Sequence, residues 1–440
     1  MTDPVQGFSR FTKEEKIRWI ARRYTARPEA TEDLLQSYWH ADPALQQLHD
    51  EFIENTLSNF YLPLGVAPNF NINGKLYAIP MAIEESSVVA AASKSAKFWG
   101  SRGGFKTQVL GTRKVGQVHF RYNGDPNTLK AFIESAMRAL MQESEGLTRN
   151  MERRGGGIHA IALRDKRQEL PGYYQLHCEF ETRDAMGANF INSCLEQFAT
   201  TLEKEARTYP GFKGEEAPLE ILMSILSNYV PDCRVRATVS CPVADLGQDN
   251  GMDGETFARR MIQAVKIAEA DPFRAVTHNK GIMNGIDAVV IATGNDFRAV
   301  EAGVHAYACR SGKYRSLSHA DISEGEFRFW LEVPLALGTV GGLTKLHPMV
   351  RLALEILGNP TAPELMEITA TAGLAQNYGA LSSLVTVGIQ RGHMKMHLLN
   401  ILNEQGASPE EKDLLIDYFK THTVSHSAVT ERLKKLRNPG

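Results

Sequence analysis

The feature that most constrains the fold is a change of hydrophobic period in the second quarter of the chain. Residues 117–122 alternate apolar and polar side chains, which predicts a strand. A long amphipathic helix is predicted next, because apolar residues recur at intervals of three and four, at Leu129, Phe132, Ile133, Ala136, Met137 and Leu140. Further strands are predicted near 158–163 and 174–182, followed by a second amphipathic helix. Residues 109–226 are therefore expected to form a small α+β domain inserted in a larger one.

The size and composition of the chain indicate a folded protein of more than one unit. Its 440 residues are 43% hydrophobic and 23% charged, which suffices for a sizeable core and excludes general disorder. Lys and Arg total 49 and Asp and Glu total 51, so there is no overall basic field to attract nucleic acid or anionic lipid. Any anionic ligand has to be held by a local site.

Targeting and cysteine signals point to a cytoplasmic protein. The first residues contain no apolar stretch after a basic one, and no window of about 20 uncharged apolar residues occurs. The five cysteines are odd in number and form no CxxC pair, which predicts reduced thiols and neither disulfides nor a cysteine zinc site. They are Cys178, Cys194, Cys233, Cys241 and Cys309.

Both ends of the chain carry helix-start signals. Thr12 and Glu15 have the spacing of a capping box, and Ser408 and Glu411 have the same spacing with Pro409 between them. The second signal predicts a small helical terminal domain. Between the two ends, residues 281–308 alternate apolar runs with glycines, which is typical of tightly packed helices.

The usual nucleotide-binding signatures are missing, because neither GxGxxG after a strand nor GxxxxGK[ST] occurs. The best candidate for a dinucleotide is the segment from Asp184 to Asn189, at the start of a predicted helix whose free amides favour a pyrophosphate. An ordinary capped helix start with small residues for packing explains the segment equally well.

A lysine in an apolar segment is the second candidate. Lys280 lies among His278, Asn279 and two glycines, where a solvated surface charge is poorly placed. It is expected to be partnered, with Asp296 as the nearest acidic candidate after Asp287. A buried Lys and Asp pair would stabilise an oxyanion, but a structural ion pair is at least as good an interpretation.

Two further groups carry titratable side chains. Glu84 and Glu85 precede an apolar helix, where they would complement the helix dipole unless one faces a cleft as a proton donor. His393 and His397 share one helical face, yet no glutamate follows His393 and no third ligand is evident. We therefore expect no metal there.

Taken together, these motifs resemble the hydroxymethylglutaryl-coenzyme A reductases of the second, mostly prokaryotic class. The resemblance extends in order from Glu84 through Asp184–Asn189, His278–Asn284, Gly294–Glu301 and Gly338–Gly342 to Gly392–His397. It implies an α+β fold, with a large α-rich domain, an inserted ferredoxin-like cofactor domain and a C-terminal helical flap. The implied parts are residues 1–108, 109–226, 227–378 and 379–440.

The resemblance also implies a reaction, the reversible reduction of a thioester to mevalonate in two hydride transfers with release of coenzyme A. Lys280 would stabilise the oxyanion, Glu85 would donate a proton to the carbonyl oxygen and Asp296 would orient Lys280. His393, brought in by the flap, would protonate the CoA thiolate, since an imidazolium is the stronger acid.

Binding residues follow from the same motif match. The hydroxymethylglutaryl portion would be contacted by Ser87, Arg274, Asn284 and Asn377, with His397 near the coenzyme A arm. The nicotinamide cofactor would be contacted by Asp184, Met186, Gly187, Asn189, Thr148 and Arg149. A homodimer, or an oligomer of dimers, with the active site at its interface is implied, without a metal, a nucleic acid or a membrane.

Two departures from the family pattern matter. Ser86 stands where proline is usual, so that loop is expected to be less rigid. Thr148 stands where members that prefer NAD have an aspartate before the three glycines, and it is followed by Arg149, Arg153 and Arg154. This predicts NADPH rather than NADH, unless the arginines form only a solvated basic edge.

Two other interpretations of the residues stay open at this point. A CoA-dependent acyltransferase or thioesterase would use Lys280 and His393 without nicotinamide chemistry. A non-catalytic binding protein with the same fold is less favoured, because binding alone does not need Glu85, Lys280, Asp296 and His393 together.

Overall fold

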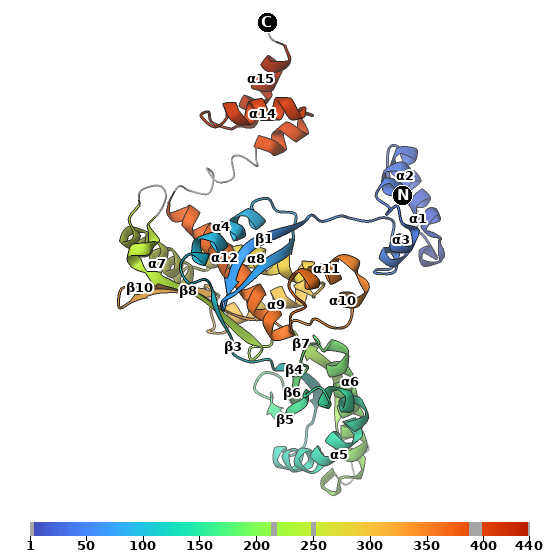
Figure 1. Ribbon diagram of the computed structural model, residues 1–440. Helices are drawn as coiled ribbons and strands as arrows, with labels where there is room; N and C mark the ends of the chain where they lie inside the picture. The colour runs from blue at the N-terminus through green and yellow to red at the C-terminus, as the bar shows by residue number, and fades with distance from the viewer. Residues whose placement is uncertain (1–3, 213–217, 248–251, 387–397, 439–440) are drawn as a thin grey trace. The chain divides into compact units, whose positions relative to one another are not determined.

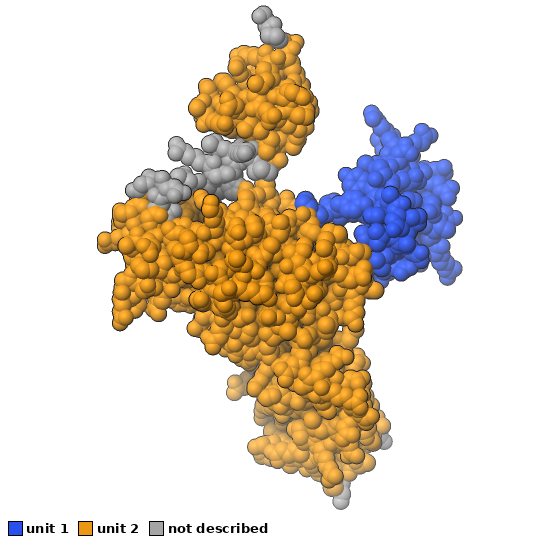
Figure 2. Space-filling view, viewed as in Figure 1, with its two compact units in different colours: residues 1–63 blue, residues 64–440 orange. Residues whose placement is uncertain are grey.

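The computed structural model describes residues 4–212, 218–247, 252–386 and 398–438. The chain divides into two compact units, Met1–Pro63 and Leu64–Gly440, shown in different colours in Figure 2. The segment expected to be the first part of the large domain, residues 1–108, thus spans the whole of the first unit and the beginning of the second.

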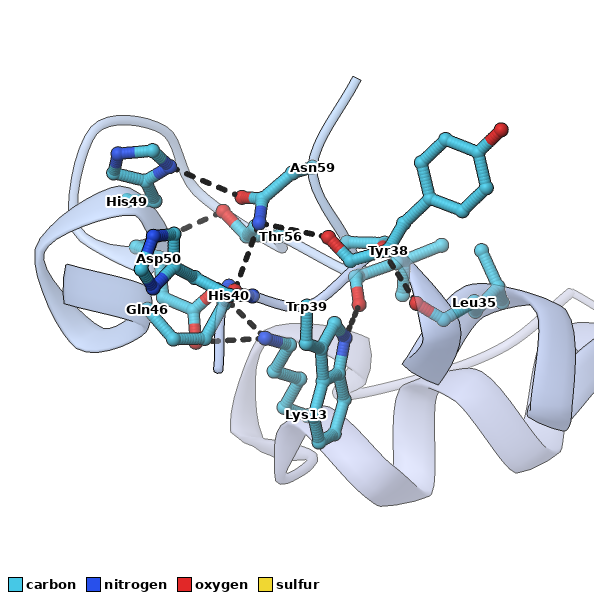
Figure 3. A network of polar contacts seen from close by, with 12 residues as sticks. Lys13, Leu35, Tyr38, Trp39, His40, Gln46, His49, Asp50, Thr56 and Asn59 are labelled. Atoms are coloured by element: carbon cyan, nitrogen blue, oxygen red, sulfur yellow. Dashed lines mark hydrogen bonds and ion pairs between the residues drawn. The ribbon is translucent and has the colours of Figure 1, made fainter. Parts of the chain in front are cut away.

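The first unit is a small helical body held together mainly by polar contacts. It contains η1 (Phe8–Arg10), α1 (Lys13–Tyr24), α2 (Pro28–Ser37) and α3 (Pro43–Asp50), and the predicted capping box of Thr12 and Glu15 is confirmed. Lys13 Nζ lies 2.7 Å from Asp50 Oδ1 and 4.0 Å from the centre of the Trp39 ring (Figure 3). A polar network supplements the few buried apolar side chains of these short helices.

The larger unit has its main core around helix α12 (Ala362–Val385). That helix is apolar on all sides and packs on α4 (Val88–Gly100), α7 (Gly254–Ala270) and α8 (Pro272–Ala292). It also contacts a sheet of order β3-β8-β10-β9. These strands are β3 (Lys106–Val109), β8 (Arg234–Pro242), β9 (Ser318–Ser323) and β10 (Glu326–Pro334). The remaining elements of this body are β1 (Leu64–Ile72), β2 (Lys75–Ala82), η3 (Val243–Leu246), α9 (Phe297–Ala308), α10 (Leu343–Leu346) and α11 (Pro348–Ile356).

Helices α8 and α12 approach each other closely because glycines lie at their contact. A Cβ atom at Gly285 would lie 2.4 Å from the carbonyl oxygen of Ala372, and one at Gly373 would lie 2.8 Å from Ile286. Larger side chains at either position would force the helices apart. This close contact fixes the position of α8, which carries the lysine singled out from the sequence.

The predicted inserted segment, coloured teal to green in Figure 1, has a hydrophobic core of its own. Its elements are β4 (Lys114–Arg121), α5 (Pro126–Glu152), β5 (Gly157–Asp165), β6 (Tyr173–Glu181), α6 (Ala188–Thr208), η2 (Pro210–Phe212) and β7 (Glu220–Ser227). The antiparallel sheet has the order β5-β6-β4-β7, and the apolar faces of both helices contribute to the core. The strands and helices predicted between residues 117 and 202 are therefore confirmed.

The segment leaves and rejoins the larger body at one place. The backbone N–H of Leu110, just after β3, donates to the carbonyl oxygen of Arg234, at the start of β8, over 2.8 Å. Strands β3 and β8 are themselves paired, with Val109 opposite Val235. The inserted segment therefore leaves the sheet after β3 and returns to it at the neighbouring strand β8.

The last described residues form a small helical body with its own apolar cluster. It includes a helical stretch at 398–404, α14 (Pro409–Tyr418) and α15 (His426–Arg437). The capping box of Ser408 and Glu411 is confirmed. Among the residues that the structure describes, no helix is both long and apolar enough to cross a membrane.

Candidate active site

Helix α8 brings the predicted lysine to a predicted glutamate. Glu85 lies in the short connection between β2 and α4, and Lys280 lies on the outer face of α8. Lys280 Nζ donates to Glu85 Oε2 over 2.5 Å, and Asn284 Nδ2 donates to the same oxygen over 3.3 Å. Three of the predicted site residues, from two segments of the chain, thus meet at one carboxylate.

The surroundings of Lys280 differ from the expectation. The sequence suggested a buried lysine paired with Asp296, but the Lys280 side chain is 59% exposed and its partner is Glu85. The orientation of α8 explains why Lys280 is exposed. Lys280 lies with Val276 and Thr277 on the exposed side of the helix, whereas the buried side carries Ile282 and Ile286.

Asp296 stabilises the start of its own helix, α9. Its carboxylate accepts hydrogen bonds from the backbone N–H groups of Arg298 and Ala299 over 3.1 and 3.2 Å, and it pairs with the Arg298 guanidinium at 3.1 Å. Within the described part of the chain, no hydrogen bond or ion pair joins Asp296 to Lys280. In this structure Asp296 therefore caps α9 and does not pair with Lys280.

Asn377 is held by a buried relay that crosses from α8 through β9 to α12. His278 Nε2 lies 2.6 Å from Ser318 Oγ, and Ser318 Oγ donates to Asn377 Oδ1 over 2.7 Å. Because a serine hydroxyl has one proton, His278 has to donate through Nε2. Burial lowers the pKa of His278 to about 3, with Arg274 and His319 adding to the effect, so this histidine is neutral. The relay fixes the amide of Asn377 in one orientation.

Two other predicted substrate residues lie at helix starts. Ser87 precedes α4 and has φ 77°, a left-handed conformation that costs a non-glycine residue energy. Arg274 lies in the first turn of α8, and desolvation lowers the pKa of its half-buried guanidinium. His393 and His397 lie outside the described residues.

One more pair of acids lies along the outer side of α8. Asp287, one turn beyond Asn284, is hydrogen-bonded to Glu301 of α9, and its Oδ1 is buried without a hydrogen-bond partner. Burial and the neighbouring Glu301 carboxyl raise the pKa of Asp287 to about 8. The sequence analysis considered Asp287 only as a partner for Lys280.

The segment Asp184–Asn189 forms the connection between β6 and α6. Gly187, with φ 91°, precedes α6, and no side-chain bond caps that helix, so its first amides remain available to an anion. Asp184 does not cap α6. Its Oδ1 accepts from the backbone N–H of Ala362, at the start of α12, over 2.8 Å. The carboxylate is thus already used for a structural bond.

This connection is linked to the lysine segment. A Cβ atom at Gly338 would lie 2.4 Å from the backbone nitrogen of Met186, so only glycine allows this approach. The N–H of Gly338 donates to Asn295 Oδ1 over 2.8 Å, and Asn295 immediately precedes Asp296 in sequence. The candidate cofactor segment and the candidate catalytic segment therefore share a rigid contact.

The three glycines after α5 border a cleft of about 610 Å³. Its walls include Gly155–Gly157 together with Arg113, Arg183 and Arg234, and the acids Glu181 and Asp232. Arg183 Nε donates to the carbonyl oxygen of Gly155 over 2.7 Å. The cleft is thus wide enough for part of a dinucleotide and carries more positive than negative side chains.

The predicted determinants of cofactor choice differ in their exposure. Thr148 is 2% exposed on the inner face of α5, so its side chain has no surface to offer a ligand. Arg149, Arg153 and Arg154 are exposed, and the structure gives their guanidinium groups no hydrogen bond or ion pair with a described residue. The three arginines are therefore exposed, whereas Thr148, expected to contact the cofactor, is buried.

Two residues that hydrogen-bond to the candidate site segments were missed from the sequence. Ser318 orients Asn377, and Lys114 of β4 bonds the connection before α6. Ser318 is 59 residues from Asn377 and has no local signal. Lys114 carried a weak signal, a lysine at the start of a strand that is otherwise mostly buried.

Comparison with known proteins identifies the relatives of this chain. The family model described as hydroxymethylglutaryl-coenzyme A reductase matches residues 13–398. The chain is 36% identical to the 3-hydroxy-3-methylglutaryl-coenzyme A reductase of Archaeoglobus fulgidus, over 100% of this chain and 96% of that protein. It is 33% identical to a probable reductase of the same name from Borreliella burgdorferi, over 88% of each.

Solved structures give the same result. The class II 3-hydroxy-3-methylglutaryl-CoA reductase from Streptococcus pneumoniae, bound to NADPH in open conformations, is 35% identical with a TM-score of 0.72. The match covers 87% of this chain and all of that one. A second structure of the Streptococcus pneumoniae enzyme covers 99% of this chain at 34% identity, also with a TM-score of 0.72.

Proposed function

The chain belongs to the hydroxymethylglutaryl-coenzyme A reductase family and resembles its class II members, and from that premise we propose how its residues carry out the reaction. It is an oxidoreductase that reduces hydroxymethylglutaryl-CoA to mevalonate. Each of two reductions adds a hydride to carbon and a proton to oxygen, and the first product loses CoA as a thiol. The residues therefore have to stabilise an oxyanion, supply protons and bind a reduced nicotinamide.

We propose that Lys280 and Glu85 act on the carbonyl oxygen of the substrate. The observation that carries this proposal is their 2.5 Å contact on an exposed face of α8. A cation placed where negative charge develops stabilises the transition state more than the ground state. Glu85, sharing a proton with the ammonium group, can deliver it to the oxygen as the negative charge forms.

Asp296 and His393 complete the proposed catalytic group. We propose that Asp296 orients Lys280 in the assembled, substrate-bound enzyme. Asp296 directly follows Asn295, whose bond to Gly338 holds this segment in place. His393 is proposed as the acid that protonates the departing thiolate. Homodimerisation, with the active site at the interface, is part of the same proposal.

The substrate contacts are proposed for four described residues. Asn284 already touches Glu85, so an acyl group at Lys280 would lie within reach of its amide. Asn377 is oriented by Ser318, and Ser87 and Arg274 lie at the starts of α4 and α8, which both pack on α12. We propose His397 near the coenzyme A arm.

A reduced nicotinamide, when bound, supplies the hydride for each reduction. The residues present suit such a group, because the uncapped start of α6 offers backbone amides and the cleft beside Gly155–Gly157 offers arginine side chains to phosphates. We propose that Met186, Gly187 and Asn189 contact the cofactor. Asp184 would act indirectly, through the backbone of the connection that it shares with Met186 and Gly187.

We propose that NADPH is preferred over NADH. Arg149, with Arg153 and Arg154, offers unpaired guanidinium groups that a 2′-phosphate would occupy. Thr148 is not part of this proposal because it is buried. Arg149→Asp should reverse or abolish the preference, measured as the ratio of kcat/KM for the two cofactors, and an unchanged ratio would contradict the assignment.

The domain organisation is proposed on the same basis. The body from β4 to β7 has the strand and helix order of a ferredoxin-like fold, and we propose it as the cofactor domain within residues 109–226. Residues 1–108 and 227–378 are proposed as the large domain, with Met1–Pro63 as a separate body in it, and 379–440 as the flap.

The test is a spectroscopic assay with matched cofactors. The protein is mixed with hydroxymethylglutaryl-CoA and either NADPH or NADH, and the loss of nicotinamide absorbance is followed with Lys280→Ala as the blank. Two equivalents oxidised per thioester, faster with NADPH and absent from the blank, are expected. Full activity in Lys280→Ala would contradict the proposed role of the lysine.

A further inference from the structure

Lys114 is a buried cation that the proposed mechanism does not use. It begins β4, is 5% exposed and points its ammonium group at the connection between β6 and α6. Lys114 Nζ donates to Thr182 Oγ1 over 2.5 Å and to the carbonyl oxygen of Ala185 over 2.7 Å. Thr182 Oγ1 itself lies 2.7 Å from the Ala185 carbonyl oxygen. These three groups form a closed triangle of polar contacts.

The opposite side of the same connection is bound to the larger body. The carbonyl oxygen of Asp184 accepts from the N–H groups of Thr339 and Val340 over 2.8 and 3.3 Å, and its carboxylate accepts from Ala362. Lys114 therefore fixes one side of residues 182–185 from within the small sheet, while the larger body fixes the other.

We propose that Lys114 is a positioning residue for the nicotinamide cofactor, holding residues 182–185 so that Met186, Gly187 and the start of α6 face the ligand. This inference rests on the proposed function of that segment. Lys114 itself is too enclosed to contact the cofactor, so it acts through Thr182 and Ala185.

The electrostatic surroundings are consistent with a structural cation. Burial lowers the pKa of Lys114, while Glu181, Asp184 and Cys233 face it and favour its charged form. Glu181 ends β6 and Asp184 lies in the connection that follows it, so both carboxylates come from the inserted segment. Removing the ammonium group would leave the Thr182 hydroxyl without its donor and the Ala185 carbonyl with one donor fewer, inside the junction.

The experiment compares four variants of the full-length protein. Lys114→Met removes the donor, Thr182→Val removes one acceptor and keeps the shape, and the double variant replaces both partners by apolar groups. Lys130→Met, at an exposed lysine of α5, is the matched control. Each is titrated with NADPH and, separately, with hydroxymethylglutaryl-CoA, and each is melted to measure its stability.

The expected pattern separates positioning from general damage. Lys114→Met should raise the Kd for NADPH about tenfold and Thr182→Val about threefold, with the Kd for hydroxymethylglutaryl-CoA unchanged. The double variant should bind NADPH no better than Lys114→Met, because the Ala185 carbonyl oxygen then loses both of its side-chain donors.

Three results would overturn the proposal. In the first, Lys114→Met and Thr182→Val both bind NADPH like the Lys130→Met control. In the second, affinities for NADPH and hydroxymethylglutaryl-CoA fall together in parallel with stability. In the third, the unchanged protein does not bind NADPH, which would also overturn the proposed cofactor site, whereas the first two would leave that site intact.

Discussion

The ammonium group of Lys280 lies 2.5 Å from the carboxylate of Glu85, although 195 residues separate the two in sequence. The carboxylate also accepts a hydrogen bond from Asn284, one turn along α8 from Lys280. An acid and a cation in direct contact are well placed to pass a proton to a substrate oxygen. The first predictions concern this pair and the residues around it.

Replacing Glu85 by Gln should lower kcat at least about 100-fold while changing substrate affinity much less, because it removes a proton donor and keeps the shape. Glu84→Gln is the matched control, since Glu84 is the exposed neighbouring acid. Single-turnover rates with NADPH measure the effect. Equal rates for the two variants would remove Glu85 from the catalytic group.

Replacing Asp296 by Asn and by Ala should separate its role as the cap of α9 from its proposed role in orienting Lys280. Asn caps a helix as well as Asp does, so Asp296→Asn should keep the stability of α9, while Asp296→Ala should cost about 1 kcal/mol. If the charge acts on Lys280, Asp296→Asn lowers kcat about tenfold or more. Asp253→Asn, at the cap of α7, is the control.

An active Asp296→Asn variant, with the rate of the control, would show that Asp296 serves only as a cap. Thermal unfolding of all three variants checks that the loss of rate is not a loss of fold.

Ser318→Ala should raise the KM for hydroxymethylglutaryl-CoA about fivefold with little change in kcat, because Asn377 loses the bond that orients its amide. It should also lower stability by about 1 to 2 kcal/mol, since His278 Nε2 loses its acceptor in a buried place. Ser240→Ala, at an exposed position of β8, is the control. An unchanged KM in Ser318→Ala would exclude Asn377 from substrate binding.

Asp287→Asn should stabilise the protein at pH 8 and have little effect near pH 4. The folded pKa of Asp287, about 8, lies above its value of about 3.9 in an unfolded chain. The unfolded state therefore loses its proton first, and stability falls as the pH rises from about 4 to about 8. Asn removes this loss and still donates to Glu301, a gain on the order of 2 kcal/mol at pH 8.

Denaturant unfolding of both proteins across that pH range measures the difference. A stability difference that is independent of pH would mean that Asp287 is ionised in the folded protein.

The elements of the small domain could be predicted from the sequence because their signals are local. Alternating and helical periods each extend over several residues, and both capping boxes depend on residues three positions apart. Lys280 and Glu85 were singled out from their local sequence, and the resemblance of their motifs to a known family implied their roles.

The partners of the site residues could not be predicted, because packing between distant segments selects them. Asp184 bonds Ala362, 178 residues away, and Lys280 bonds Glu85 rather than the nearby Asp296. Burial of Thr148 depends on which face of α5 meets the sheet. Such contacts are properties of the three-dimensional structure that no local pattern contains.

The hydrogen bond from Leu110 to Arg234, with the pairing of β3 and β8 beside it, has a consequence for the way the chain folds. The two ends of the inserted domain are joined by the host sheet, so the host can reach its native register while the insert is still unfolded. The entropy lost in closing so long a loop grows only with the logarithm of its length. The length of the insert can therefore vary at little cost in loop-closure entropy to the host.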